Sequence, residues 1–197
     1  GRGAERLVGL TLGTGIGGGI VIGGEIYHGA SDAAGEIGHV SVDYDGRLCA
    51  CGSRGCVEAY ASGPGIAARA VEGLAEGADS ALTAAAANGS GRITARLVCE
   101  AAATGDAYAS RILTETARIL AVAVANLINL LNPDVIVVAG GVTAAGNHLF
   151  GPLREEVRRR AFPSAVAACR IVPAQLPDAA GMVGAAGVFK RAAYGGP

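Results

Sequence analysis

The chain contains 197 residues, of which 51% are hydrophobic and 17% are charged, and its formal net charge is −1. A chain of this length and composition can bury one good-sized core, and it lacks the low hydrophobicity and high net charge of disordered proteins. The near-zero net charge gives no electrostatic case for binding nucleic acid or an anionic membrane surface.

The amino-terminal part predicts short strands joined by glycine-rich loops. Runs of apolar and β-branched residues place strands at residues 7–12, 19–22, 25–27 and 37–42. Gly23-Gly24 is a two-residue hairpin signal between the second and third of these strands. The segment 45–56, which carries three cysteines, is predicted to be a loop.

The rest of the chain predicts mainly helices. They are expected at about 66–75, 94–103, 107–131, 149–160 and 181–191, with a loop at 88–91 and strands at 135–138 and 170–172. The apolar run 119–131 should be buried, since it is shorter than the roughly 20 residues that span a bilayer, and Pro133 ends its helix. Gly140-Gly141 follows the 135–138 strand at its carboxyl end. This order predicts an α/β fold in which helices flank a mixed sheet.

A glycine-rich segment, Gly13-Thr14-Gly15-Ile16-Gly17-Gly18, follows the first predicted strand. It satisfies the G-x-G-x-x-G pattern of dinucleotide-binding folds, but that pattern requires the glycines to open a helix, and here they lead into a strand. A glycine-lined hairpin can instead expose backbone N–H groups to an anion, and the Thr14 hydroxyl can donate to a phosphoryl oxygen. The alternative is a tight turn that needs glycine only for its dihedral angles. The number of glycines favours a phosphate loop.

Three thiols and one imidazole lie close together in the sequence: Cys49, Cys51, Cys56 and His39. Cys₃His is a standard closed zinc set, and thiolate and imidazole ligands favour zinc over calcium or magnesium. The alternatives are buried free thiols, one disulfide with a spare cysteine, and a chance cluster. Polar, glycine-containing surroundings argue against thiols buried in a core. We therefore expect a structural zinc ion that braces the loop and, with four filled positions, does not activate water.

Two carboxylates flank this cluster, Glu36 before His39 and Glu58 after Cys56. With one ring nitrogen of His39 on zinc, the other must carry a proton and can only donate a hydrogen bond. Glu36 and Glu58 can then accept hydrogen bonds from the hydroxyl groups of a polyol. Alternatively, both are structural or surface carboxylates, and spacing alone does not choose between these roles.

The two remaining cysteines, Cys99 and Cys169, are predicted to be small buried hydrophobic residues. Thiols used as metal ligands in a chain without a secretory signal fit a reducing compartment, so we expect a cytoplasmic location. The chain opens at Gly1 and its only methionine is Met182, from which we expect a fragment or processed piece of a longer protein.

Together these motifs resemble the ROK family of repressors, open reading frames and kinases, and especially its bacterial glucokinases. The similarity is carried by residues 12–19, 34–39, 49–58, 133–142 and 180–186, of which the segment 49–58 is highly specific. The resemblance implies the two-domain sugar-kinase or actin-like ATPase fold, which is ribonuclease H-like. Residues 1–197 would then be mostly its C-terminal domain, with a zinc-binding loop at 39–58.

The resemblance also implies an activity and a set of site residues. The activity is ATP-dependent phosphorylation of a hexose, with glucose as first choice, ATP and Mg²⁺ as cofactors, and a structural Zn²⁺. Substrate contacts fall on Glu36, His39 and Glu58, and zinc contacts on His39, Cys49, Cys51 and Cys56. Phosphate and nucleotide contacts fall on Gly13, Thr14, Gly15, Gly17, Gly140 and Gly141. The hexose and ATP are the expected partners, together with a second copy of the chain in a homodimer or higher homo-oligomer.

Kinases of this family also carry an Asp-x-Gly-x-Thr phosphate loop and an Asn-Asp pair whose aspartate is the general base, and this sequence contains neither. We therefore expect the base upstream, no kinase turnover by residues 1–197 alone, and a final helix at about 181–191 that packs on the amino-terminal domain. The rival interpretation is a sugar-sensing transcriptional repressor of the same family. The intact glycine segment favours the kinase, because a sensor has no need to hold a transferable phosphate.

Overall fold

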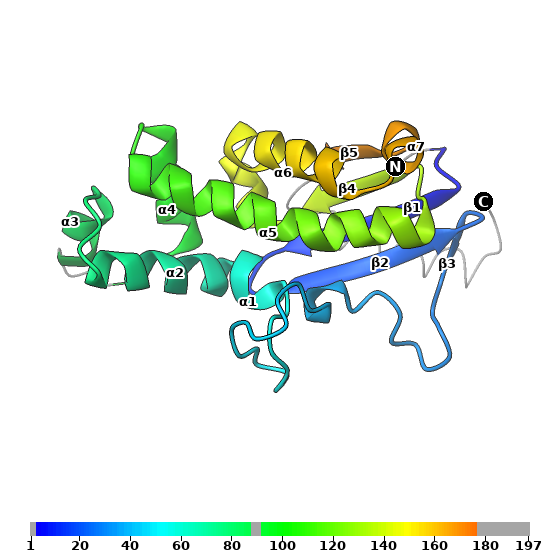
Figure 1. Cartoon of the computed structure of the whole chain (residues 1–197), viewed down its shortest axis with the longest axis horizontal. Coiled ribbons are helices and arrows are strands. Elements are labelled where there is room, and N and C mark those ends of the chain that lie inside the picture. The colour runs from blue at the N-terminus through cyan, green and yellow to red at the C-terminus, as the bar shows by residue number, and fades with distance from the viewer. Residues whose placement is uncertain (1–2, 88–91, 177–197) are drawn as a thin grey trace.

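The computed structural model describes residues 3–87 and 92–176, and their strands form one mixed sheet. The strands are β1 (Arg6–Leu12), β2 (Ile16–Ile22), β3 (Glu25–Ile26), β4 (Val135–Ala139) and β5 (Arg170–Pro173). Their order across the sheet is β3-β2-β1-β4-β5 (Figure 1). β1, β2 and β3 form an antiparallel meander, whereas β4 and β5 run parallel to β1. The predicted α/β class and mixed sheet are confirmed.

The hairpin between β1 and β2 is tighter than the sequence predicted. β2 begins at Ile16 and not at residue 19, because Leu12 pairs with Ile16 and the two strands stay in register from there. Only residues 13–15 remain as the connecting turn. The next hairpin turns at Gly23 and Gly24, whose φ angles of 61° and 78° are the left-handed values that such a two-residue turn requires.

The strand predicted at residues 37–42 is wrong. Ile37–His39 forms the short 3₁₀ helix η1, and Ser41 makes only an isolated bridge to Cys56. Gly38 lies so close to β2 that a Cβ on it would be 2.3 Å from the carbonyl oxygen of Ile16. The apolar alternation in this segment therefore reflects packing across the edge of β2 and not pairing within the sheet.

The predicted helices are confirmed where the structure describes them, with small changes at their ends. The helical elements are α1 (Glu58–Ala61), α2 (Gly63–Ala75), α3 (Leu82–Ala87), α4 (Ala95–Ala103), α5 (Ala107–Leu131), η2 (Gly141–Ala145), α6 (Asn147–Arg160) and α7 (Pro163–Ala168). α2 starts three residues earlier than predicted because the Ser62 hydroxyl caps it by accepting from the Gly65 N–H. The short α1, α3 and α7 were not predicted. The loop at 88–91 and the helix at 181–191 lie outside the described residues.

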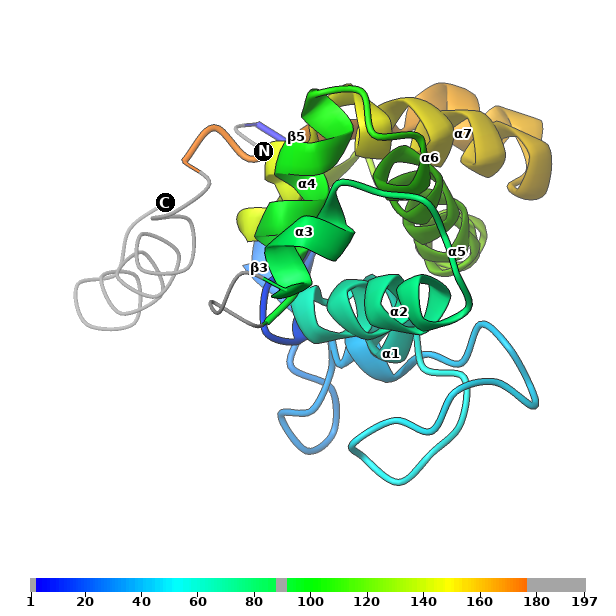
Figure 2. The same ribbon diagram turned by 90° about the vertical axis from the view of Figure 1, so that its left-hand side faces the viewer.

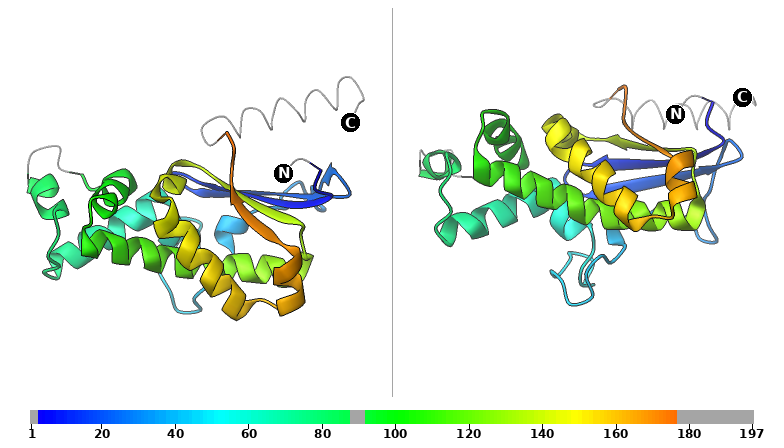
Figure 3. Two further views of the ribbon diagram at one scale, coloured as in Figure 1. Left: turned by 90° about the horizontal axis from the view of Figure 1, so that it is seen from above. Right: turned by 45° about the horizontal axis from the view of Figure 1, so that its top comes forward.

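Helices α5 and α6 lie against one face of the sheet, while α2, α3 and α4 extend beyond the end of its strands (Figures 1 and 3). Figure 2 shows the near end of α5 with α4 to its left and α2 below it. The side chains of Val8, Leu10 and Leu12 alternate along β1 to face the core, where Ile136 and Val138 of β4 join them. The carboxyl ends of β1 and β4 lie on the side of the molecule that carries α2 and α4 (Figure 1).

The central helix α5 is a buried core element. By length and hydropathy alone it could cross a membrane, but 61% of its apolar window is buried inside the fold. Asn132, with a left-handed φ of 43°, ends it immediately before Pro133. At its start, the carboxylate of Asp106 accepts the Ala109 N–H at 2.8 Å and also the Ala81 N–H and Ser80 hydroxyl.

We expect replacement of Asp106 by alanine to lower the free energy of unfolding by about 1 kcal/mol, as loss of a helix N-cap typically does. Denaturant unfolding of the full protein measures this difference. Asp106→Asn is the matched control, because asparagine keeps a side-chain oxygen in the capping position. An alanine variant as stable as the wild type at neutral pH would contradict the assignment of the cap.

The same cap predicts a pH dependence. Burial opposes ionisation of Asp106, but its hydrogen bonds outweigh burial and hold the pKa of this carboxyl below its ordinary value. A carboxylate with a lowered folded-state pKa stabilises the protein above the unfolded-state pKa and loses that contribution as pH falls through the folded-state pKa. The stability difference between wild type and Asp106→Ala should therefore shrink below about pH 4.

Candidate functional site

A pocket of about 320 Å³ lies where the β1–β2 hairpin meets η1, α1 and the end of β4. Its lining contains most of the residues singled out from the sequence: Gly13, Thr14, Gly15, Gly17, Glu36, His39, Glu58 and Gly140. Thr11 and Ile16 complete it and were not predicted. Segments distant in the sequence thus place a glycine turn, two carboxylates and an imidazole around one space.

Close approach, and not the dihedral angles, explains three glycines of the β1–β2 hairpin, Gly15, Gly17 and Gly18, whereas Gly13 and Gly19 have room for a Cβ. None of the five glycines between residues 13 and 19 has a positive φ. A Cβ on Gly15 would lie 2.6 Å from Oε2 of Glu58, and one on Gly18 would lie 2.4 Å from the carbonyl oxygen of Gly35. The alternative of a turn that needs glycine only for its conformation therefore does not account for this segment.

The hairpin turn leaves hydrogen-bonding groups unused at the pocket. The Gly13 N–H donates to the Gly15 carbonyl at 2.9 Å, and the Gly13 carbonyl accepts the Gly63 N–H of α2 at 2.8 Å. By contrast, the backbone N–H groups of Thr14 and Gly15 and the Thr14 hydroxyl have no partner among the residues that the structure describes. Two amides and one hydroxyl are therefore available to an anion at the exposed tip of the hairpin.

Glu58, the first residue of α1, connects this hairpin to the cysteine loop. Its Oε2 accepts the Ile16 N–H at 2.7 Å, and its Oε1 lies 4.0 Å from Sγ of Cys49. The carboxylate is half-buried between the two segments. Both oxygens therefore have a structural neighbour, and the residue also lines the pocket, so the two roles left open by the sequence are not exclusive.

The three thiols and the imidazole converge as a tetrahedral metal site requires. The ligand atoms of His39, Cys49, Cys51 and Cys56 all lie within 4.8 Å of one another. Sγ of Cys49 is 3.8 Å from Nδ1 of His39, and the sulfur atoms of Cys51 and Cys56 are 3.7 Å apart. Ligands 2.3 Å from a tetrahedral zinc are separated by about 3.8 Å, so this group can hold such an ion.

The competing interpretations of the cysteines fit less well. All five are free thiols, and the 3.7 Å separation of Cys51 from Cys56 is not that of a disulfide. Cys49 and Cys56 are more buried than predicted, but their sulfur atoms lie within the group of four candidate ligands, and neither residue belongs to the main hydrophobic cluster. Burial and the neighbouring thiols raise the pKa of Cys56 to about 12, so a cation is needed to keep it as a thiolate at neutral pH.

His39 presents its two ring nitrogens to different groups. Nδ1 faces Cys49, whereas Nε2 lies 3.9 Å from Oε2 of Glu36 and lines the pocket. A metal on Nδ1 would leave Nε2 as a hydrogen-bond donor directed to the pocket, as the sequence predicted. The Glu36 side chain is exposed and free to contact a ligand.

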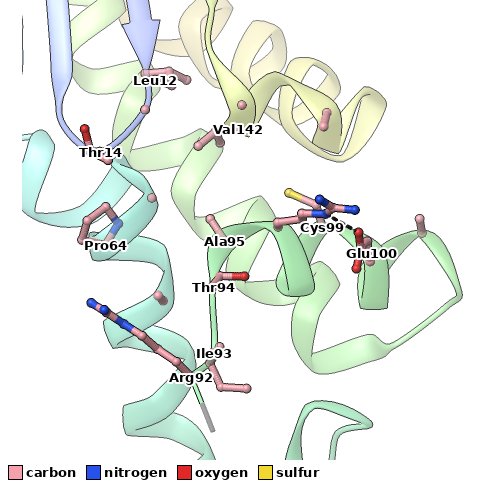
Figure 4. A pocket seen from close by; sticks show the side chains of 17 residues that line it. Leu12, Thr14, Pro64, Arg92, Ile93, Thr94, Ala95, Cys99, Glu100 and Val142 are labelled. Atoms are coloured by element: carbon pink, nitrogen blue, oxygen red, sulfur yellow. Dashed lines mark hydrogen bonds and ion pairs between the residues drawn. The ribbon is translucent and has the colours of Figure 1, made fainter. Parts of the chain in front are cut away.

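A second, larger cavity of about 630 Å³ also adjoins the hairpin tip, where α2 and α4 form its walls (Figure 4). Gly13 and Thr14 line both cavities, whereas Gly141 lines only the larger one and Gly140 only the smaller one. Apolar groups of Leu12, Pro64, Ile93, Ala95 and Val142 form much of the larger cavity. It is therefore shaped for a ligand with a flat or apolar part, adjoining the anion-accepting turn.

Sequence reasoning missed most of the larger cavity, because its walls come from α2 and α4. The available signal was Gly63-Pro64-Gly65, a run of small residues at the start of α2. A Cβ on Gly63 would lie 3.1 Å from the Gly13 carbonyl oxygen, so this run lets the helix approach the hairpin. Of the other cysteines, Cys99 is buried as predicted, but Cys169 is partly exposed because α7 ends just before it.

Known proteins are similar in sequence to nearly the whole chain. The family model described as "ROK family" matches residues 1–192. A glucokinase from Thermotoga maritima is 40% identical over 97% of the chain, which spans 60% of that relative. A putative xylose repressor from Caldicellulosiruptor is 31% identical over 91% of the chain and 45% of that relative.

Solved structures agree with the sequence comparison. The crystal structure of a glucokinase from Streptomyces griseus, in complex with glucose and AMPPNP, superposes with a TM-score of 0.82 and 36% identity. The match covers 95% of the chain and 61% of that protein. The chain therefore has the α/β fold of sugar kinases, the actin-like ATPase fold, and spans about three fifths of the kinases that it matches.

Proposed function

The chain belongs to the ROK family, and from this premise we propose that the protein that contains it is an ATP-dependent hexose kinase that converts glucose to glucose 6-phosphate. Residues 1–197 would be the C-terminal domain of a two-domain enzyme. One observation carries the proposal: a single pocket brings the unpartnered amides of the β1–β2 turn together with Glu36, His39 and Glu58. An anion site beside polyol-binding groups is what phosphoryl transfer to a sugar needs.

In this proposal the smaller pocket holds the sugar. Carboxylates accept hydrogen bonds from hydroxyl groups, and a protonated Nε2 of His39 donates one, so the three side chains can fix the orientation of a hexose ring. Glu58 is the best-positioned of them, because the Ile16 N–H already holds its Oε2 at 2.7 Å. A fixed acceptor loses little freedom when the sugar binds, which favours an aligned reactive hydroxyl.

The hairpin turn would receive the transferred phosphate. The N–H groups of Thr14 and Gly15 and the Thr14 hydroxyl can stabilise negative charge on phosphoryl oxygens. ATP brings Mg²⁺ on its phosphates, where the ion neutralises part of their charge. We expect the general base outside residues 1–197, because these residues lack the Asn-Asp pair that supplies the base in kinases of this family.

The larger cavity would take the nucleoside of ATP. It has room for a base and ribose, adjoins the same turn, and is lined by Gly141 at the carboxyl end of β4, where ligands of α/β sheets commonly bind. The AMPPNP bound in the Streptomyces griseus relative supports this donor.

We further propose a cytoplasmic enzyme that assembles as a homodimer or higher homo-oligomer.

We propose that the Cys₃His cluster holds a structural zinc ion. The donor set and the spacing of the ligand atoms fit a closed tetrahedral site. Because protein groups fill all four positions, the ion would brace residues 39–58 and with them Glu58. The ion would thus help to bind the sugar by holding Glu58 in place and not by acting as a Lewis acid.

The second candidate function is a sugar-sensing transcriptional repressor, which the similarity to the putative xylose repressor favours. Such a protein would use the same sugar pocket without phosphoryl transfer. The unpartnered amides at Thr14 and Gly15 favour the kinase. Sugar-dependent DNA binding by the full-length protein, without phosphorylation of any sugar, would identify the repressor.

We expect the full-length protein to phosphorylate at least one hexose with ATP and Mg²⁺ in a coupled assay. The panel should include glucose, mannose, fructose and N-acetylated hexosamines, because the pocket geometry does not distinguish them. If no sugar is phosphorylated at saturating ATP and Mg²⁺, the kinase assignment is wrong.

For the metal site, elemental analysis of purified protein should find one zinc per chain. Cys56→Ser should abolish this zinc, because it replaces a ligand with a much weaker donor. Cys99→Ser is the matched control, since Cys99 is buried away from the cluster and its replacement should leave the zinc content unchanged. Equal zinc in both variants would contradict the assigned ligands.

For the sugar pocket, Glu58→Gln should lower kcat/KM by roughly 10- to 100-fold, the range expected when a hydrogen bond to a charged group is lost. Glutamine can still accept the Ile16 N–H but presents an amide donor where the sugar needs an acceptor. Glu155→Gln on the exposed face of α6 is the control and should leave kinetics unchanged. Unchanged kinetics for Glu58→Gln would return Glu58 to a purely structural role.

A further inference from the structure

Tyr60 lies two residues after Glu58 on α1, and its hydroxyl is built into the cysteine loop. The hydroxyl accepts the Arg47 N–H at 2.8 Å and donates to Oδ2 of Asp43 at 3.0 Å. Only 9% of Tyr60 is exposed, whereas Asp43 lies at the surface, so the bonds of the hydroxyl are partly buried. A single side chain thereby fastens the first part of the loop to α1.

The loop is shaped around this hydroxyl. A Cβ on Gly46 would lie 2.2 Å from the Tyr60 oxygen, so only glycine admits the ring at this point. Gly55, with a φ of 72°, would place a Cβ 1.7 Å from the Asp43 carbonyl oxygen, and its N–H donates to the Arg47 carbonyl at 2.8 Å. The two glycines let both arms of the loop close over the tyrosine.

The backbone of Tyr60 is connected in the opposite direction, to the core. NH1 of Arg69 lies 3.5 Å from the Tyr60 carbonyl oxygen and 2.8 Å from Oγ1 of Thr116 on α5. NH2 of Arg69 pairs with Glu115 at 2.7 Å. The Arg69 side chain is only 9% exposed, and Thr116 is fully buried. α1 is therefore anchored to the central helix by a buried cation.

Within residues 56–60, every second residue takes part in a different set of contacts. Cys56 belongs to the metal cluster, Glu58 to the pocket, and Tyr60 to the contacts with Asp43 and Arg47. The cluster restrains the loop at 39, 49, 51 and 56, whereas Tyr60 restrains it at 43 and 47. Residues 43 and 47 lie between the cluster positions 39 and 49, so Tyr60 holds a part of the loop that carries no metal ligand, and neither restraint replaces the other.

We propose that Tyr60 is a positioning residue that fastens the loop 41–56 to α1 independently of the metal, and so sets the ligand atoms of the cluster and the carboxylate of Glu58 in their working geometry. Its effect on the sugar rests on the proposed kinase function, whereas its effect on the loop does not. The Arg47 guanidinium adds a second, separate restraint on the same stretch of the loop, because it forms a two-point ion pair with Glu72 of α2.

Tyr60→Phe tests the proposal, because it removes one oxygen and keeps the ring. In the full-length protein we expect zinc affinity, measured by competition with a chromophoric chelator, to fall about tenfold, as for residues that support metal ligands. In zinc-stripped protein, amide hydrogen exchange should rise across residues 43–55. In the kinase assay KM for the hexose should rise with little change in kcat.

Tyr108→Phe is the matched control. Its hydroxyl is bonded to the backbone carbonyls of Ala70 and Arg69 in α2, at 2.9 Å and 3.2 Å, it is 4% exposed, and it makes no hydrogen bond to the cysteine loop among the residues that the structure describes. The control therefore loses a buried hydroxyl of the same kind and should lose comparable stability, but its zinc affinity and loop exchange should stay within twofold of wild type. Equal zinc affinity in the two variants would overturn the proposal.

Asp43 supplies a second test if Tyr60→Phe does not fold. Asp43→Ala removes the acceptor of the Tyr60 hydroxyl and should lower zinc affinity in the same direction, whereas Asp43→Asn, which retains an acceptor, should restore it. Failure of Asp43→Ala to change zinc affinity would also overturn the proposal. If no hexose is phosphorylated but these zinc effects appear, the positioning role stands and the kinase assignment fails.

Discussion

The hydrogen bond from the Ile16 N–H to the Glu58 carboxylate is the contact on which the arrangement of the site depends. It joins the start of β2 to the start of α1, two elements that belong to different parts of the fold. It fixes the carboxylate that faces the cysteine loop directly to the strand that follows the glycine turn, in addition to the contacts of Gly63 with Gly13 and of Gly38 with Ile16. Because Gly15 offers no side chain, the carboxylate can approach the strand closely enough to make this bond.

Around this contact, the fold uses missing side chains to bring backbone segments together. A Cβ on Gly18 would clash with the Gly35 carbonyl. In the same way, a Cβ on Gly38 would clash with the Ile16 carbonyl of β2, and one on Gly140 with the Leu12 carbonyl. A single substitution at such a position would move backbone and not merely a side chain. Glycine at these positions is thus a packing requirement, which ties the pocket geometry to the sheet.

The sequence predicted the long, strongly patterned elements well and the crowded ones poorly. α5 was correct at both ends, because Asp106, Asn132 and Pro133 mark its limits locally. The strand expected at 37–42 was wrong, since the same alternation serves a 3₁₀ turn packed on β2. The metal cluster was predicted from the chemistry and spacing of its ligands, whereas the sugar-binding roles of Glu36, His39 and Glu58 followed from the family resemblance. Tyr60 and Arg69 escaped notice, because their partners become visible only when α1, α2 and α5 pack together.

The tip of the β1–β2 hairpin separates two cavities by the width of a single turn, since Gly13 and Thr14 line both. Any displacement of that partition by an occupant on one side alters the space offered on the other. By thermodynamic linkage such an influence is mutual, so each occupant would change the affinity for its neighbour by the same factor. Cooperativity between two ligands can therefore arise here from a partition two residues thick, without a long-range change of shape.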